Sequence, residues 1–105
     1  MSAPRAGRTL TRDELRETVS RIAEEHGAER VWLYGSWARG DVGPGSDVDL
    51  LLDEGDMRTL MDIASFHLDC EDALGCTVDV TMNGALRPRF ARRIAADAEL
   101  LYERA

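Results

Sequence analysis

The chain has 105 residues, of which 44% are hydrophobic, and this length and composition predict a single domain with one core. Residues 1–10 lack hydrophobic periodicity and predict a flexible tail, which leaves 11–105 as the domain. Twenty acidic residues against thirteen arginines and no lysine give a formal charge of −7, which argues against broad electrostatic binding to nucleic acid or to an anionic membrane. The absence of lysine also excludes a P-loop. An acidic protein that handles polyphosphates would need metal ions to do so.

Two further features concern the compartment. The sequence shows no signal peptide and no apolar run of membrane-spanning length, so we expect a cytoplasmic protein without membrane contact. Cys70 and Cys76 have neither CxxC spacing nor a neighbouring histidine cluster. We therefore expect reduced, structural thiols.

The first half of the chain predicts one helix and two strands. Thr11 and Glu14 fit a capping box, and apolar residues at helical spacing predict a helix over about 12–26 that ends at Gly27. Two β-prone runs bounded by glycines predict strands, and the glycine-rich connection between them has room for one helical turn near Ser36–Arg39. The expected strands are 31–34 and 48–52.

The second half predicts a long helix, a strand, a short helix and a final strand. Asp56 fits the N-cap of the long helix, Gly75 follows its end, and Pro88 falls in the first turn of the short helix. This order of elements predicts an α/β fold, a small mixed sheet with helices mainly on one face. The apolar stripe of the long helix is expected at Met57, Leu60, Met61, Ala64 and Leu68. The other expected ranges are 76–82, about 86–95 and 100–102.

Three aspartates occupy interior positions of two apolar strands. Asp47 and Asp49 alternate with apolar residues and so share one face of their strand, and Asp79 lies in the same phase on the next strand. If the apolar residues of both strands face one helix layer, the three carboxylates emerge together on the other side of the sheet. Such a cluster is destabilising because neighbouring carboxylates raise one another's pKa, and a hard divalent cation relieves it. A lone strand aspartate is usually a solvated surface residue, but this trio predicts a metal site.

A second motif follows the first predicted strand. The run Gly35–Gly40 predicts a strand-to-helix turn, whose backbone N–H groups and helix dipole suit a phosphate. Gly35 would let the phosphate approach the backbone, and Ser36 would add a hydroxyl donor. A Gly-Ser pair alone is usually an ordinary turn. Its position ten residues before an Asp-x-Asp makes it informative.

The sequence Gly35-Ser36, ten intervening residues, Asp47-x-Asp49 and a later Asp79 resembles the nucleotidyltransferase superfamily of the DNA polymerase β type. The chain is most similar to the minimal nucleotidyltransferases, which are often antitoxin partners of HEPN-domain ribonuclease toxins. The resemblance implies transfer of a nucleoside monophosphate from Mg-NTP to a hydroxyl. For the toxin-paired members it implies transfer of AMP from ATP to a tyrosine of the toxin, which neutralises the toxin.

The resemblance also implies roles for individual residues. Gly35 and Ser36 would hold the β- and γ-phosphates. Asp47 and Asp49 would bind both of two Mg²⁺ ions. Asp79 would bind the second ion and help to orient or deprotonate the attacking hydroxyl. Two ions arranged in this way clamp the attacking and leaving oxygens of an in-line displacement at phosphorus.

Other residues have structural as well as functional interpretations. Arg39 could reach a phosphate or be a solvated side chain. Tyr34 and Trp37 could stack on a base, but aromatic residues beside strands more often belong to the core. Asp41, His26 and His67 are interpreted as turn or structural residues. A basic group on the third predicted helix could be a solvated face, or could meet an acidic partner or the nucleotide: Arg87, Arg89, Arg92 and Arg93.

Two alternative functions stay open. One is an antitoxin that neutralises its toxin by binding alone, with a vestigial acidic site. The other is a small-molecule adenylyltransferase, although such enzymes carry a second domain for the small molecule. No segment of the chain looks able to enclose the adenine base, which suggests that the partner completes the site. Direct nucleic-acid binding is not expected.

Overall fold

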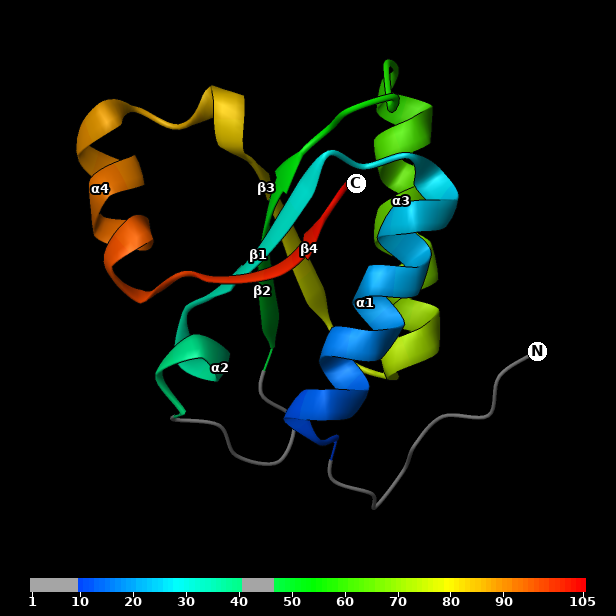
Figure 1. The fold of residues 1–105 in the computed structure, drawn as a ribbon, viewed down its shortest axis with the longest axis horizontal. Helices are drawn as coiled ribbons and strands as arrows, with labels where there is room; N and C mark the ends of the chain where they lie inside the picture. The colour runs from blue at the N-terminus through cyan, green and yellow to red at the C-terminus, as the bar shows by residue number, and fades with distance from the viewer. Residues whose placement is uncertain (1–9, 41–46) are drawn as a thin grey trace.

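The computed structural model describes residues 10–40 and 47–105. The predicted tail, apart from Leu10, and the turn residue Asp41 lie outside these ranges. Helices and strands alternate along most of the chain (Figure 1). The elements are α1 (Arg12–His26), β1 (Arg30–Tyr34), α2 (Ser36–Arg39), β2 (Val48–Asp53), α3 (Leu60–Leu74), β3 (Val78–Met82), the 3-10 turn Asn83–Ala85, α4 (Pro88–Asp97) and β4 (Glu99–Glu103).

The four strands form one mixed sheet in the order β3-β2-β1-β4. β1 pairs antiparallel with both β2 and β4, and β2 pairs parallel with β3. Parallel neighbours need a crossover connection, which α3 provides. The two long helices α1 and α3 cover one face of the sheet, whereas α2 and α4 lie on its other side (Figure 1). The predicted α/β fold with a small mixed sheet is confirmed.

The first helix follows its sequence signals. The Glu14 N–H donates to the Thr11 hydroxyl at 3.1 Å, and the Glu14 carboxylate accepts from the Thr11 N–H at 3.1 Å. These two bonds form the predicted capping box. Gly27 ends the helix at a φ of 76°, in the left-handed region that favours glycine. The predicted stripe is buried: Leu15, Val19, Ile22 and Ala23.

The start of α3 differs from the prediction. The helix begins at Leu60, and its N-cap is Thr59 and not Asp56. The Asp62 N–H donates to the Thr59 hydroxyl at 3.2 Å, and the Asp62 carboxylate accepts from the Thr59 N–H at 3.2 Å. Because this second capping box satisfies the first free N–H groups of the helix, the three preceding residues form a loop.

The orientation of α3 also differs from the prediction. Its core side is formed by Phe66, Cys70 and Leu74, whereas most of the predicted stripe faces outward. The helix carries two apolar stripes, and periodicity alone does not tell which one is buried. Although α3 exposes an apolar stripe, no helix within the described residues is long and apolar enough to cross a membrane. The exposed members of the predicted stripe are Leu60, Met61, Ala64 and Leu68.

The last elements lie close to their predicted ranges. β3 begins at Val78, two residues later than predicted, and Pro88 is the first residue of α4. A 3-10 turn that the sequence analysis does not predict precedes α4. These shifts are of the size expected where helices and strands fray or are capped by neighbours.

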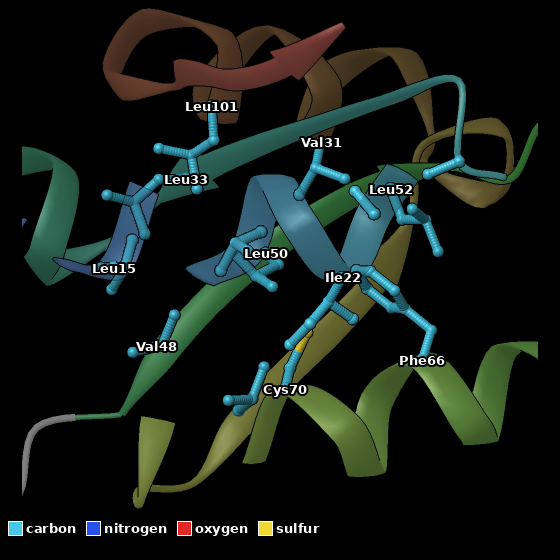
Figure 2. Close-up of a cluster of buried hydrophobic side chains, with 14 of the residues drawn as sticks. Leu15, Ile22, Val31, Leu33, Val48, Leu50, Leu52, Phe66, Cys70 and Leu101 are labelled. Atoms are coloured by element: carbon cyan, nitrogen blue, oxygen red, sulfur yellow. The ribbon is translucent and has the colours of Figure 1, made fainter. Parts of the chain in front are cut away.

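The main core lies between the sheet and the layer formed by α1 and α3. Figure 2 shows Leu15 and Ile22 of α1 and Phe66 of α3 directed toward apolar residues of the strands. On β2 the buried residues of this core alternate with Asp49. Because these buried residues pack against α1 and α3, the Asp49 side chain lies on the opposite face of β2. The strand residues of the core are Val31, Leu33, Val48, Leu50, Leu52, Val78 and Leu101.

Both cysteines are free thiols, as predicted. Cys70 is fully buried, and burial raises the pKa of its thiol to about 12. Because the thiolate is the reactive form, we expect a thiol reagent at about pH 8 to modify Cys76 slowly and Cys70 not at all in the native protein. Intact mass before and after addition of urea checks this, with two labels expected only after unfolding. Native labelling of Cys70 at the rate of the unfolded chain would contradict its burial.

Candidate active site

The predicted aspartates lie at one end of β2 and β3. Asp49 is the second residue of β2, where it pairs with Tyr34 of β1 on one side and with Asp79 of β3 on the other. Residues opposite one another on neighbouring strands share a face. The Asp49 and Asp79 carboxylates are therefore neighbours on the face that α1 and α3 leave open. Asp47 immediately precedes β2 and is exposed, as is Asp79, whereas Asp49 is half-buried.

The three carboxylates influence one another. Burial raises the pKa of Asp49 above its ordinary value, and the charge of Asp79, a hydrogen bond with Asp79 and the charge of Asp47 raise it further. The positive charge of Arg39 acts in the opposite direction on this pKa. The net effect disfavours ionised Asp49, as expected where like charges meet in a partly desolvated place.

The donor set at this place fits a hard divalent cation. Carboxylate oxygens are the ligands that Mg²⁺ prefers, and a cation would relieve the interactions that raise the pKa of Asp49. As the side chains lie, no three acidic, histidine or cysteine residues in the described ranges are gathered closely enough to hold an ion. Asp49 and Asp79 are adjacent, whereas Asp47 acts on Asp49 through its charge. Closure of all three around an ion stays a prediction.

The turn between β1 and α2 lies against Asp49. Gly35 has φ 72° and ψ −149°, a backbone region that is almost restricted to glycine. A Cβ atom at this position would overlap the Asp49 carboxylate oxygen and lie 3.2 Å from Cγ of Asp49. Only glycine therefore brings this turn so close to the aspartate.

The predicted helical turn after Gly35 is confirmed as α2. Ser36 is its first residue, and the Arg39 N–H donates to the Gly35 carbonyl at 3.1 Å. Trp37 is 8% exposed and belongs to the main core, as its structural interpretation predicts. The buried indole fixes α2 to the domain, so Ser36 has a defined position next to Gly35.

Tyr34 borders the aspartates on the open face. It pairs with Asp49, yet its hydroxyl lies 3.0 Å from the Thr81 hydroxyl on β3. Because β2 lies between these two strands, the tyrosine ring must cross β2 on the face that carries Asp49. Tyr34 therefore lies half-buried on the open face beside the carboxylates and is not part of the main core that its structural interpretation predicts.

Arg39 connects α4 with this region. Its guanidinium lies 3.9 Å from the carboxylate of Asp97, the last residue of α4, and its charge also acts on Asp49. Asp97 is a neighbour of the site that the sequence analysis does not identify. Asp97 is far from Arg39 along the chain, so no local pattern indicates their contact. Arg39 is placed where it could contact a phosphate near Gly35.

The two histidines have structural contacts elsewhere. The His26 ring lies 2.7 Å from the Asp69 carboxylate and meets the Phe66 ring edge-on. His67 is hydrogen-bonded to the Val78 carbonyl. Their structural interpretation is confirmed.

Comparison with known proteins starts from the family models. The model described as "Polymerase beta, Nucleotidyltransferase" matches residues 17–105, which include every element of the sheet. "Putative protein adenylyltransferase MJ0435" of Methanocaldococcus jannaschii is 30% identical over 86 residues, which cover 82% of this chain and 92% of the relative.

Solved structures give the same fold. A "putative minimal nucleotidyltransferase" superposes with a TM-score of 0.71 at 39% identity, over 80% of this chain and 86% of the other. A complex of tri-AMPylated Shewanella oneidensis HEPN toxin with MNT antitoxin superposes with a TM-score of 0.69 at 11% identity, over 90% of this chain and 74% of the other. At 11% identity this second likeness concerns the fold alone.

Proposed function

The chain belongs to the polymerase β-type nucleotidyltransferase family; on that premise we propose that it is a Mg²⁺-dependent protein adenylyltransferase. It transfers AMP from ATP to a tyrosine hydroxyl of a HEPN-domain toxin. This transfer neutralises the toxin, so the chain acts as the antitoxin. The observation that carries this proposal is the Asp49–Asp79 pair on the open face of the sheet, next to Gly35. The protein acceptor is supported by the name of the M. jannaschii relative and by the AMPylated toxin in the S. oneidensis complex.

In the proposed site the carboxylates hold metal and the α2 turn holds phosphate. Asp47 and Asp49 would hold the ions, with Asp79 as a further ligand. Two bound divalent cations would neutralise phosphate charge and stabilise the attacking and leaving oxygens. The Gly35 turn and the Ser36 hydroxyl donate hydrogen bonds to the β- and γ-phosphates. Arg39 adds a positive charge beside them.

The proposed transfer is an in-line displacement at phosphorus. The acceptor oxygen forms a bond to the α-phosphorus of ATP, the bond from that phosphorus to the β-phosphate oxygen breaks, and pyrophosphate leaves. Asp79 is exposed on the open face, where it can orient the acceptor hydroxyl and take its proton.

Mass spectrometry tests the proposed transfer. We expect a HEPN-domain toxin partner to gain one or more AMP units when it is incubated with ATP, Mg²⁺ and this protein. With Asp79→Ala we expect the gain to fall at least about a hundredfold, because metal and proton transfer are both impaired. Thr77→Ala, an exposed site just before the same strand, serves as the matched control and should keep full activity.

Two outcomes contradict the proposal. If the toxin is inhibited without a change in mass, and Asp79→Ala inhibits it equally well, the chain neutralises the toxin by binding alone. If AMP transfer proceeds at the same rate with EDTA in place of Mg²⁺, the metal role of the carboxylates is wrong.

A further inference from the structure

This acidic protein has a group of arginines on and just before α4 without ion-pair partners in residues 10–40 and 47–105. Four arginines on and just before this helix are exposed, and none forms an ion pair with another described residue. Most described arginines elsewhere are paired with carboxylates. The unpaired group is Arg87, Arg89, Arg92 and Arg93; the paired residues are Arg12, Arg16, Arg21, Arg30, Arg39 and Arg104.

The helix turns this charge away from the sheet. Ile94 is 7% exposed and anchors α4, which lies next to β1. Arg89, Arg92 and Arg93 have i, i+3, i+4 spacing and so lie together on a side of the helix that Ile94 does not share. Like charges at this spacing destabilise a helix on their own. A negatively charged partner would remove that repulsion.

An aromatic side chain accompanies the arginines. Phe90 is 49% exposed and lies one turn before the buried Ile94, at the border of the side that carries Arg89. Arginine and exposed aromatic residues are the types enriched at the centres of protein interfaces. We call Arg89, Arg92 and Arg93 the α4 basic face; Phe90 borders it, and Arg87 immediately precedes the helix.

The α4 basic face lies beside the candidate active site. α2 and α4 are on the same side of the sheet (Figure 1), and the Arg39–Asp97 contact joins their ends. We propose that the α4 basic face docks an acidic surface patch of the acceptor protein, next to the hydroxyl that receives AMP. The inference rests on the proposed function, and it adds the chemistry by which the acceptor is recognised.

A protein fits the α4 basic face better than other anions do. Arg89, Arg92 and Arg93 lie on a side of α4 that the buried Ile94 does not share, so a nucleotide held at the sheet would not meet them. A nucleic acid would satisfy the charge but would leave Phe90 half-exposed, and the rest of this chain, at a net charge of −7, would repel a long polyanion. An acidic protein patch with an apolar border satisfies both the arginines and Phe90.

A pair of charge-reversed variants tests the docking. Arg89→Glu/Arg93→Glu reverses the α4 basic face, and Arg21→Glu/Arg58→Glu makes the same change of charge at exposed positions on α1 and before α3. Binding of the HEPN-domain toxin partner is measured by calorimetry without nucleotide. AMP transfer to it, binding of Mg-ATP and binding of a 20-mer RNA are measured alongside.

We expect the α4 variant to bind the HEPN-domain protein at least about tenfold more weakly and to transfer AMP correspondingly less, with the control within about twofold of wild type. Mg-ATP affinity should be the same in all three proteins. The variant Arg89→Ala/Arg93→Ala adds no negative charge to the helix and should show a smaller loss of toxin binding. It replaces the charge-reversed α4 variant if the latter does not fold.

Each contrary result has a distinct meaning. Unchanged toxin binding by the α4 variant overturns the inference, even if AMP transfer proceeds and the proposed function holds. Loss of Mg-ATP or RNA binding in place of toxin binding overturns it in favour of a nucleotide or nucleic-acid role. If toxin binding depends on the α4 basic face but no AMP is transferred by wild type, the proposed function fails and the docking inference survives.

Discussion

Asp49→Asn is expected to lower AMP transfer at least about a hundredfold while the folded domain is kept. The asparagine amide has the shape of the carboxylate and can donate its N–H to Asp79, which an ionised carboxylate cannot do, but it supplies one oxygen without charge to a metal ion. Asp53→Asn is the matched control, since Asp53 lies at the other end of β2 with Arg30 and Asn83 as partners. It should keep transfer activity. Equal losses in both variants would mean that Asp49 has no special role.

The same variant has a predicted effect on stability without metal. The pKa of Asp49 is higher in the folded state than its value of 3.8 in the unfolded chain. The contribution of Asp49 to the free energy of unfolding is therefore fully present below pH 3.8 and is lost as the pH rises through the raised pKa. Asparagine does not undergo this loss. We therefore expect metal-free Asp49→Asn to melt at or above the wild-type temperature at pH 7, and this advantage to vanish below pH 3.8. A lower melting temperature at pH 7 would show that the ionised carboxylate is a structural partner.

Gly35→Ala is expected to reduce both stability and transfer. The backbone conformation costs a residue with a side chain about 1–3 kcal/mol, and the new methyl group overlaps the Asp49 carboxylate. For a chain of this size each kcal/mol lowers the melting temperature by roughly 4–8 °C. Displacement of the turn from Asp49 should lower AMP transfer more than the loss of stability explains. Single-turnover transfer rates, corrected for the fraction of folded protein, check this.

Gly40→Ala separates strain from contact. Gly40 also has a positive φ, 81°, but a Cβ there meets nothing within 4 Å. We expect this variant to lose about 1 kcal/mol of stability and to keep nearly all of its transfer activity. If Gly40→Ala impairs transfer as much as Gly35→Ala does, close approach of the turn to Asp49 is not what matters.

Local sequence signals predict most of the fold. The Thr11 capping box, the glycine at the end of α1 and the alternation in β2 each depend on a few neighbouring residues, and the structure agrees with them. The start and burial of α3 could not be predicted, because Asp56 and Thr59 are both good N-caps and the helix has two apolar stripes. Tertiary packing makes the choice between such alternatives.

The candidate site shows the same division. Strand phase alone predicts that Asp47 and Asp49 share a face, and the same reasoning brings Asp79 beside them if the strands are neighbours. The contacts of Arg39 with Asp97 and of Tyr34 with Thr81 join elements that are remote in the chain. No local pattern encodes such pairs, so they become visible only in the folded chain.

The parallel pairing of β2 with β3 has a consequence for folding. β1 and β2 follow one another as antiparallel neighbours, whereas Asp79 reaches Asp49 only after the crossover through α3 has closed. Closing such a connection costs more loop entropy than local contacts do, and non-local pairing slows folding. The repulsion between the two carboxylates therefore arises only once the sheet is complete. A cation that relieves this repulsion would slow unfolding more than it speeds folding, and would protect the finished domain without guiding its assembly.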